Sequence, residues 1–237
     1  MATNALFCFG TKLSKNTAST SIELEELLHS YRFAKVQVAP DGGCLFASVL
    51  FQLKQMLSAC NSDLAKHLQV LGFNIMEMRD DKAAIAALRA LMVAEMLENR
   101  VEYEGYLINE SVEYEQQVRE FQKLGVYSEE VDNLMALSLS NVLRINIVLL
   151  TSMVNFPVIP VTPRGNICTD KTLYLAYFGS GHYDPVVEDA INAQDNDQPM
   201  QSIPSFQKKG AKGCGCGRGA SSNKSHPGGR SAKKFCF

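Results

Sequence analysis

The amino-acid sequence predicts an α+β domain in which a small central β-sheet is packed between helices. Apolar side chains recur every three or four positions between residues 20 and 143, which is the period of an amphipathic helix. Runs of β-branched and aromatic residues, bounded by turn residues, gather after residue 145. The chain has 237 residues, 46% hydrophobic and 20% charged, so it can fill one domain core and still carry a tail.

The helical pattern predicts six helices before the sheet is complete. The first begins near Thr20, where residues 20–23 have the spacing of a capping box, and the second begins directly after Gly43. The others are expected at 63–71, 82–99, 111–125 and 128–143. Strands are expected at 35–38, 145–150, 157–161, 172–178 and 183–187, mostly antiparallel, with helices on both faces of the sheet.

Composition divides the chain into three parts. Residues 1–19 are expected to form a flexible arm, residues 20–192 a catalytic domain, and residues 193–237 a disordered tail rich in Gly, Ser, Lys and Cys. From residue 195 onward there are eight basic and two acidic side chains, a charge of +6. The remainder has 15 basic and 23 acidic side chains, a charge of −8, so an acidic body carries a basic tail.

The expected location of the chain is the cytoplasm or the nucleus. Every apolar stretch long enough to cross a membrane is interrupted by charged or strongly polar residues, and the first residues lack the pattern of a secretory signal. We therefore expect no membrane partner. In a reducing compartment the seven cysteines are thiols, metal ligands or nucleophiles rather than disulfide partners.

Cys44 is the first candidate for chemistry. Two glycines precede it, and the predicted helix begins at the cysteine itself. A thiol at a helix N-terminus faces unpaired N–H groups and the positive end of the helix dipole, which favours the thiolate. The same N–H groups can hold the oxyanion that forms on an attacked carbonyl. Taken alone, a cysteine followed by Leu45 and Phe46 is more often a buried apolar residue.

His182 and Asp184 form the second candidate. Both follow a glycine-rich turn, and residues two apart in a strand point the same way. The carboxylate of Asp184 is therefore expected to reach one ring nitrogen of His182, which leaves the other to exchange a proton with a thiol. A lone histidine near a strand end is more often structural, so it is the pairing with Cys44 that favours catalysis.

These segments resemble the active-site motifs of the ovarian-tumour (OTU) cysteine proteases. Residues 41–48, Asp-Gly-Gly-Cys-Leu-Phe-Ala-Ser, are similar to the nucleophile motif, and residues 181–184, Gly-His-Tyr-Asp, to the histidine motif. The resemblance covers about residues 20–190 and implies an OTU-type, papain-like fold. It implies that Cys44 is the nucleophile, His182 the general base and then acid, Asp184 the orienting acid, and Asp41 the loop acid that shapes the oxyanion-hole turn.

The resemblance also implies a function. It is that of a thiol-dependent deubiquitinase, which hydrolyses isopeptide or peptide bonds at the C-terminal Gly-Gly of ubiquitin or polyubiquitin, with no cofactor and no metal. Two alternatives stay open at this point. One is an inactive OTU fold that binds ubiquitin, and the other is a cysteine peptidase that acts on a ubiquitin-like modifier or on a polyprotein.

The tail has separate features. It contains four soft donors, Cys214, Cys216, His226 and Cys236, but a structural zinc site normally has cysteine pairs two to four residues apart. We therefore predict no metal site there. The charge of +6 suits a weak electrostatic contact with nucleic acid or an acidic partner, although the tail lacks interleaved aromatic residues on which bases could stack.

Overall fold

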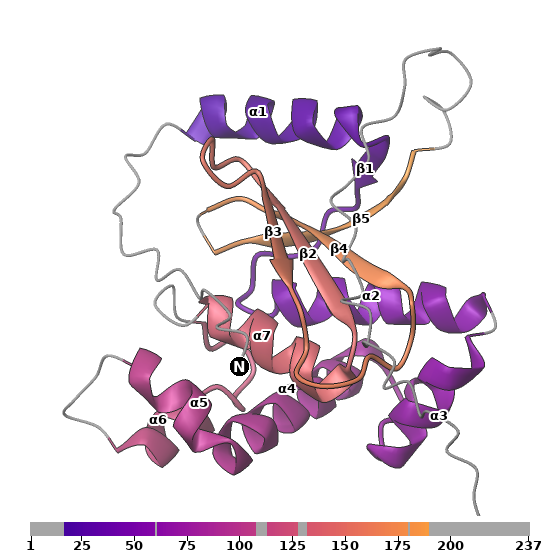
Figure 1. The fold of residues 1–237 in the computed structure, drawn as a ribbon, viewed down its shortest axis with the longest axis vertical. Helices are drawn as coiled ribbons and strands as arrows, with labels where there is room; N and C mark the ends of the chain where they lie inside the picture. Colours follow the sequence, from indigo (N-terminus) through magenta and orange to yellow (C-terminus); the bar gives the residue numbers. More distant parts are fainter. Residues whose placement is uncertain (1–16, 60, 108–112, 128–131, 180, 190–237) are drawn as a thin grey trace, which may run out of the picture. The chain divides into compact units, whose positions relative to one another are not determined.

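The structure is a computed structural model that describes residues 17–59, 61–107, 113–127, 132–179 and 181–189 (Figure 1). Within these ranges the helices are α1 (Thr17–Ser30), α2 (Cys44–Ser58), α3 (Ser62–Val70), α4 (Asp81–Glu98), α5 (Arg100–Tyr103), α6 (Tyr114–Glu120) and α7 (Asp132–Leu143), with short 3₁₀ turns η1 (Ile75–Glu77) and η2 (Glu104–Tyr106). The strands are β1 (Phe33–Lys35), β2 (Asn146–Thr151), β3 (Val158–Val161), β4 (Thr172–Tyr177) and β5 (Tyr183–Glu188).

The five strands form one small mixed sheet in the order β1-β5-β4-β2-β3. Three of the neighbouring pairs are antiparallel, as expected, but β2 and β4 are parallel. The parallel pair arises from the path of the chain. Strand β3 runs back antiparallel along one side of β2, and β4 then runs along the other side of β2 in the same direction as β2. Residue Asp184 pairs with Ala176 near the start of β5.

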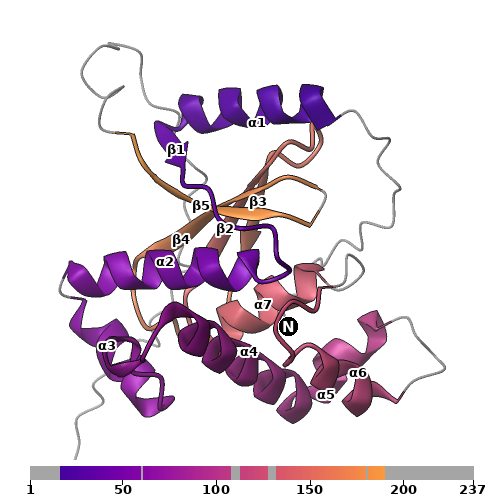
Figure 2. The same ribbon diagram turned by 180° about the vertical axis from the view of Figure 1, so that it is seen from behind.

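Helices cover both faces of the sheet, which confirms the predicted α+β class. Helix α1 packs on β1 and β2, whereas α2 packs on β5 and β4, and α7 on β2 and β3. Figures 1 and 2 show α1 on one side of the sheet and α2 with α7 on the other, with α4 beneath them. All six residues of β2 are buried, as a central strand between two helical layers requires.

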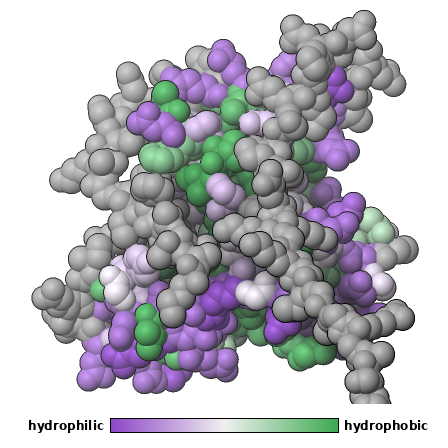
Figure 3. Space-filling model, viewed as in Figure 1, coloured by the Kyte–Doolittle hydropathy of each residue, from purple (hydrophilic) through white to green (hydrophobic). Residues whose placement is uncertain are grey.

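Helix α4, beneath α2 and α7, supplies part of the core. Leu88, Met92 and Met96 lie on one face of α4 and are fully buried, whereas Ile85 on the same helix is only partly buried. In the view of Figure 3, apolar side chains gather over the middle of the sheet, and hydrophilic ones predominate around α1 and the lower helices, with apolar residues between them. No helix among the described residues is both long enough and apolar enough to cross a membrane.

Three element boundaries differ from the sequence prediction. The strand expected at 35–38 is β1 at Phe33–Lys35, so the two share only Lys35. The helix expected at 111–125 is only α6, and residues 121–127 continue it as an irregular segment with a positive φ at Gly125. Helix α1 begins at Thr17, ahead of the expected capping box. The predicted start of the sixth helix, the first residues of the arm and the whole tail beyond residue 189 lie outside the described residues.

Candidate active site

Cys44 is the first residue of α2, directly after a tight turn. Gly42 has a φ of +74°, which glycine adopts without strain, and Gly43 is the N-cap residue. The carboxylate of Asp41 accepts the N–H of Gly43 at 2.8 Å and so closes the turn. No side chain caps the start of α2, and the first N–H groups of a helix point outward from its N-terminal end. They are therefore placed as oxyanion donors would be.

The sulfur of Cys44 points to the turn that precedes His182. Its Sγ donates to the carbonyl oxygen of Gly181 at 3.6 Å, across 137 residues of sequence. Cys44 is only 3% exposed. The structure thus brings the two predicted motifs into direct contact at the edge where α2 meets the beginning of β5.

His182 has one occupied and one open ring nitrogen. Nε2 lies 3.1 Å from Oδ1 of Asp184, as the alternation of side chains in a strand predicts. Nδ1 is buried and has no hydrogen-bond partner among the described residues. A tautomer with the proton on Nε2 therefore leaves Nδ1 as a proton acceptor. The ring also lies 5.6 Å from that of Phe178 at the other end of the turn.

Asp184 connects the histidine to the chain that leads to Cys44. Its side chain is 4% exposed, and the same Oδ1 that contacts His182 accepts the N–H of Val38 at 3.0 Å. Val38 lies between β1 and the glycine turn, so one carboxylate oxygen holds both halves of the site. Removing it would leave a backbone donor without its partner as well as a less restrained imidazole.

A polar stripe on α2 fixes the position of the helix against the sheet. Cys44, Ser48 and Gln52 are spaced by four residues and share one face of the helix. The hydroxyl of Ser48 donates to the Tyr183 carbonyl at 3.1 Å, and the amide of Gln52 donates to the Val186 carbonyl at 2.7 Å. Sequence reasoning missed this stripe, although polar residues at positions i, i+4 and i+8 of an otherwise apolar helix were its visible signal.

The bridging segment, residues 121–127, contacts the glycine turns of both motifs. A Cβ atom on Gly42 would lie 2.4 Å from the carbonyl oxygen of Gly125. A Cβ atom on Gly181 would lie 2.0 Å from the hydroxyl oxygen of Tyr127. Such close approaches are open only to glycine, which explains why glycine is needed at both turns. The sequence placed Gly125 as a helix-ending residue and did not predict this role.

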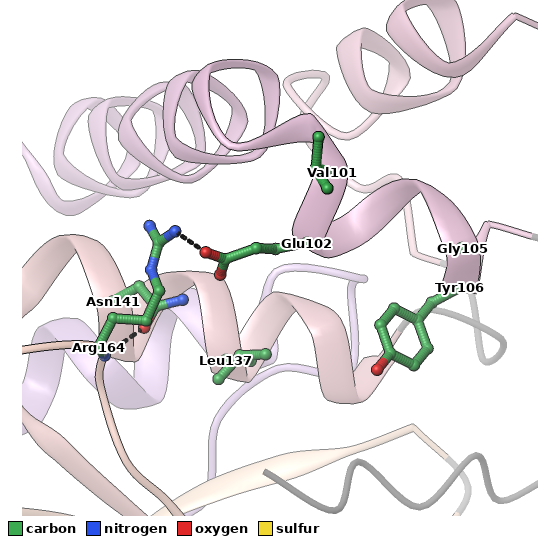
Figure 4. A pocket seen from close by; sticks show the side chains of 7 residues that line it. All are labelled: Val101, Glu102, Gly105, Tyr106, Leu137, Asn141 and Arg164. Atoms are coloured by element: carbon green, nitrogen blue, oxygen red, sulfur yellow. Dashed lines mark hydrogen bonds and ion pairs between the residues drawn. The ribbon is translucent and has the colours of Figure 1, made fainter. Parts of the chain in front are cut away.

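A separate cavity of about 580 Å³ lies between α5, η2 and α7 (Figure 4). Its polar groups pair with one another: the guanidinium of Arg164 forms an ion pair with Glu102, and the backbone N–H of Arg164 donates to the side-chain oxygen of Asn141 at 2.8 Å. None of the four predicted site residues lines it. The nearby carboxyl of Glu95, bonded to Tyr103 and Arg164, has a raised pKa because it is largely removed from water.

Cys168 is the other cysteine among the residues that the structure describes. Cys168 donates to the Leu143 carbonyl at 3.3 Å, and burial raises the pKa of its thiol, which suits an unreactive residue. In the described part of the chain, no three His, Cys, Asp or Glu side chains gather as a metal ion requires. The four soft donors of the tail lie outside the described residues.

Comparisons with known proteins returned structural likenesses only. No family model matches the chain, and no curated protein matches it. The structure is similar to the OTU domain of OTUD1, with a TM-score of 0.47, 17% identity, and coverage of 72% of this chain and 96% of that one. It is also similar to h/ceOTUB1 in a structure with ubiquitin aldehyde and UBCH5B~Ub (TM-score 0.47, 16% identity, 76% and 84% covered) and to ceOTUB1 in a complex with ubiquitin aldehyde and UBC13~Ub (0.46, 17%, 76% and 88%). A likeness at this level assigns neither an activity nor a substrate to the chain.

Proposed function

We propose that this chain is a cysteine peptidase that removes ubiquitin, with residues 20–192 as its catalytic unit and Cys44, His182, Asp184 and Asp41 as its site. The observation that carries the proposal is the contact of the Cys44 sulfur with the turn before His182, whose ring is bonded to a buried carboxylate. Ubiquitin as the substrate follows from the resemblance of both motifs to those of OTU proteases.

In the proposed mechanism Nδ1 of His182 accepts the proton of the Cys44 thiol. The thiolate attacks the carbonyl carbon of the scissile bond, and the N–H groups at the start of α2 receive the negative charge on the carbonyl oxygen. The imidazolium then protonates the leaving amine, which departs and leaves a thioester on Cys44. Water that has lost a proton to His182 attacks the thioester, which releases a carboxylate and restores the thiol.

The two acids have different roles in this proposal. Asp184 orients the imidazole through Nε2 and favours the imidazolium that forms during each proton transfer. Asp41 does not touch the reacting atoms. It holds the N–H of Gly43, and with it the turn from which the oxyanion donors project. A change at Asp41 is therefore expected to act on geometry rather than on proton transfer.

Access to the sulfur limits the substrate. Cys44 is almost completely buried, and the bridging segment contacts the turns on both sides of it. An extended chain without side chains next to the scissile bond is the easiest to admit, and the Gly-Gly end of ubiquitin meets that requirement. We infer that the ring of Tyr127 moves away from Gly181 when the substrate enters.

Cleavage of diubiquitins and of ubiquitin-like modifier fusions tests the proposal. The wild-type protein is expected to cleave at least one ubiquitin substrate, and Cys44→Ala to cleave none while its unfolding midpoint stays close to that of the wild type. Cys168→Ala is the matched control and should keep full activity. Binding of ubiquitin without cleavage would favour the inactive alternative, and cleavage of modifier or polyprotein sequences alone would replace ubiquitin as the substrate.

A further inference from the structure

Arg89 is a fully buried arginine in the middle of α4. Its Nη1 donates to the carbonyl oxygens of Phe121 at 2.9 Å and Val126 at 3.0 Å, and its Nη2 donates to the carbonyl oxygen of Gly42. The guanidinium carbon lies 4.3 Å from the ring centroid of Phe46, two residues after the nucleophile. One side chain is therefore hydrogen-bonded both to the bridging segment and to the turn before Cys44.

The charge of Arg89 is not neutralised by a close acid. No carboxylate lies within ion-pair distance of it in the described ranges, although buried charges are normally paired. Burial lowers the pKa of Arg89, while Asp41 and the Cys44 thiol act in the opposite direction. Both of these acidic groups belong to the candidate site.

We propose that Arg89 is a positioning residue that ties the Gly42 turn to the bridging segment and stabilises the ionised form of Cys44. The planar fork of arginine can hold carbonyls from two separate segments, which the single ammonium of lysine does less well. A positive charge close to a thiol favours the thiolate. The inference rests on the proposed function for its importance, but its test needs no substrate.

The test separates the charge of Arg89 from its hydrogen bonds. Arg89→Gln removes the charge but keeps an amide donor, and Arg89→Lys keeps the charge but loses the fork. The rate of Cys44 alkylation by iodoacetamide is followed against pH by peptide mass spectrometry in the full chain. Hydrogen–deuterium exchange of peptides covering residues 36–43 and 121–127 reports on the tie between the two segments.

Two internal comparisons accompany the variants. Cys168, whose thiol is disfavoured as an anion by burial, should stay slow at low pH in every variant. Arg164→Gln removes an arginine that pairs with Glu95 and Glu102 at the separate cavity. This control variant should leave the Cys44 pH profile unchanged even if it destabilises the fold.

We expect Arg89→Gln to slow Cys44 alkylation about tenfold near about pH 6 and to leave it unchanged near about pH 9.5, because a displaced thiol ionisation affects only the low-pH rate. Arg89→Lys should stay within about twofold of the wild type at the lower pH. Both variants should speed exchange in the bridging segment.

If the Cys44 alkylation rate of Arg89→Gln follows the same pH profile as the wild type, Arg89 does not stabilise the thiolate. If hydrogen–deuterium exchange in Arg89→Lys is unchanged, Arg89 does not tie the Gly42 turn to the bridging segment. If the Gln variant does not fold, the Lys variant decides: loss of its low-pH alkylation refutes the charge role. Slow alkylation of Cys44 at low pH in the wild-type protein would count against an activated thiol in the proposed function and against stabilisation of the thiolate by Arg89. The exchange data would still test whether Arg89 ties the Gly42 turn to the bridging segment.

Discussion

Replacing Gly42 by alanine tests whether the bridging segment holds the turn of the nucleophile. The added Cβ would lie 2.4 Å from the carbonyl oxygen of Gly125 and 2.8 Å from its carbonyl carbon. Ordinary contact begins at 3.4 Å, so one backbone must retreat by about 1 Å. Gly165→Ala is the matched control, because Gly165 has a φ of +72° against +74° for Gly42 and nothing lies within 4 Å of its Cβ position.

Both substitutions place alanine in the left-handed backbone region, but only Gly42→Ala also overpacks a neighbouring segment. Alanine in the left-handed region costs about 1–2 kcal/mol at either position. Overpacking adds about 1–3 kcal/mol at Gly42 alone. The expected losses in unfolding free energy are therefore about 2–5 kcal/mol for Gly42→Ala and about 1–2 kcal/mol for Gly165→Ala. A displacement of about 1 Å beside Cys44 should also lower the cleavage rate by about 100-fold in the first variant only.

Urea unfolding followed by circular dichroism, together with the cleavage rate at a concentration where each variant is folded, measures both effects. Equal destabilisation by the two substitutions would show that the approach to Gly125 exerts no constraint. Full activity of Gly42→Ala despite its lower stability would show that the position of this turn does not control the reacting group.

Three further predictions concern other contacts of the fold. Asp184→Ala should lower activity more than Asp184→Asn, because asparagine keeps an oxygen for the imidazole and for the N–H of Val38. The alanine variant should also lose about 1–3 kcal/mol of unfolding free energy in urea. Equal effects of the two substitutions would contradict the dual contact of Asp184. Gln52→Leu leaves three backbone groups of the sheet without their partner and should cost about 2–4 kcal/mol, whereas Gln55→Leu on the exposed side of α2 should be nearly neutral. Because the pKa of Glu95 is raised in the fold, the native chain binds this proton more tightly, so the contribution of Glu95 to the unfolding free energy falls as pH rises above about 4.5. Glu95→Gln should flatten that fall, and an unchanged slope would refute the assignment.

Local rules account for much of the site that could be predicted from the sequence. The glycines before Cys44 mark the entry to α2, and the alternation of side chains along a strand places His182 beside Asp184. The contact between the two motifs depends on tertiary packing, which no local pattern encodes. The motif resemblance supplied the expectation that Cys44 and His182 come together.

The missed residues are polar side chains whose partners are distant in sequence. Arg89 and Gln52 sit within helices, where such residues usually face solvent. Their partners are main-chain carbonyls 32 to 134 residues away, and a carbonyl leaves no trace in the sequence pattern. For the same reason the apolar runs of β2 and β4 located the strands but could not indicate that they pair in parallel.

Capture of the protein by ubiquitin carrying a C-terminal electrophile tests the central claim most directly, since it needs both a recognised ubiquitin and a reactive sulfur. Peptide mapping should show one adduct on Cys44, and none should form in Cys44→Ala or at appreciable rate in His182→Ala. An adduct on another cysteine, or no adduct on folded wild-type protein, would contradict the account.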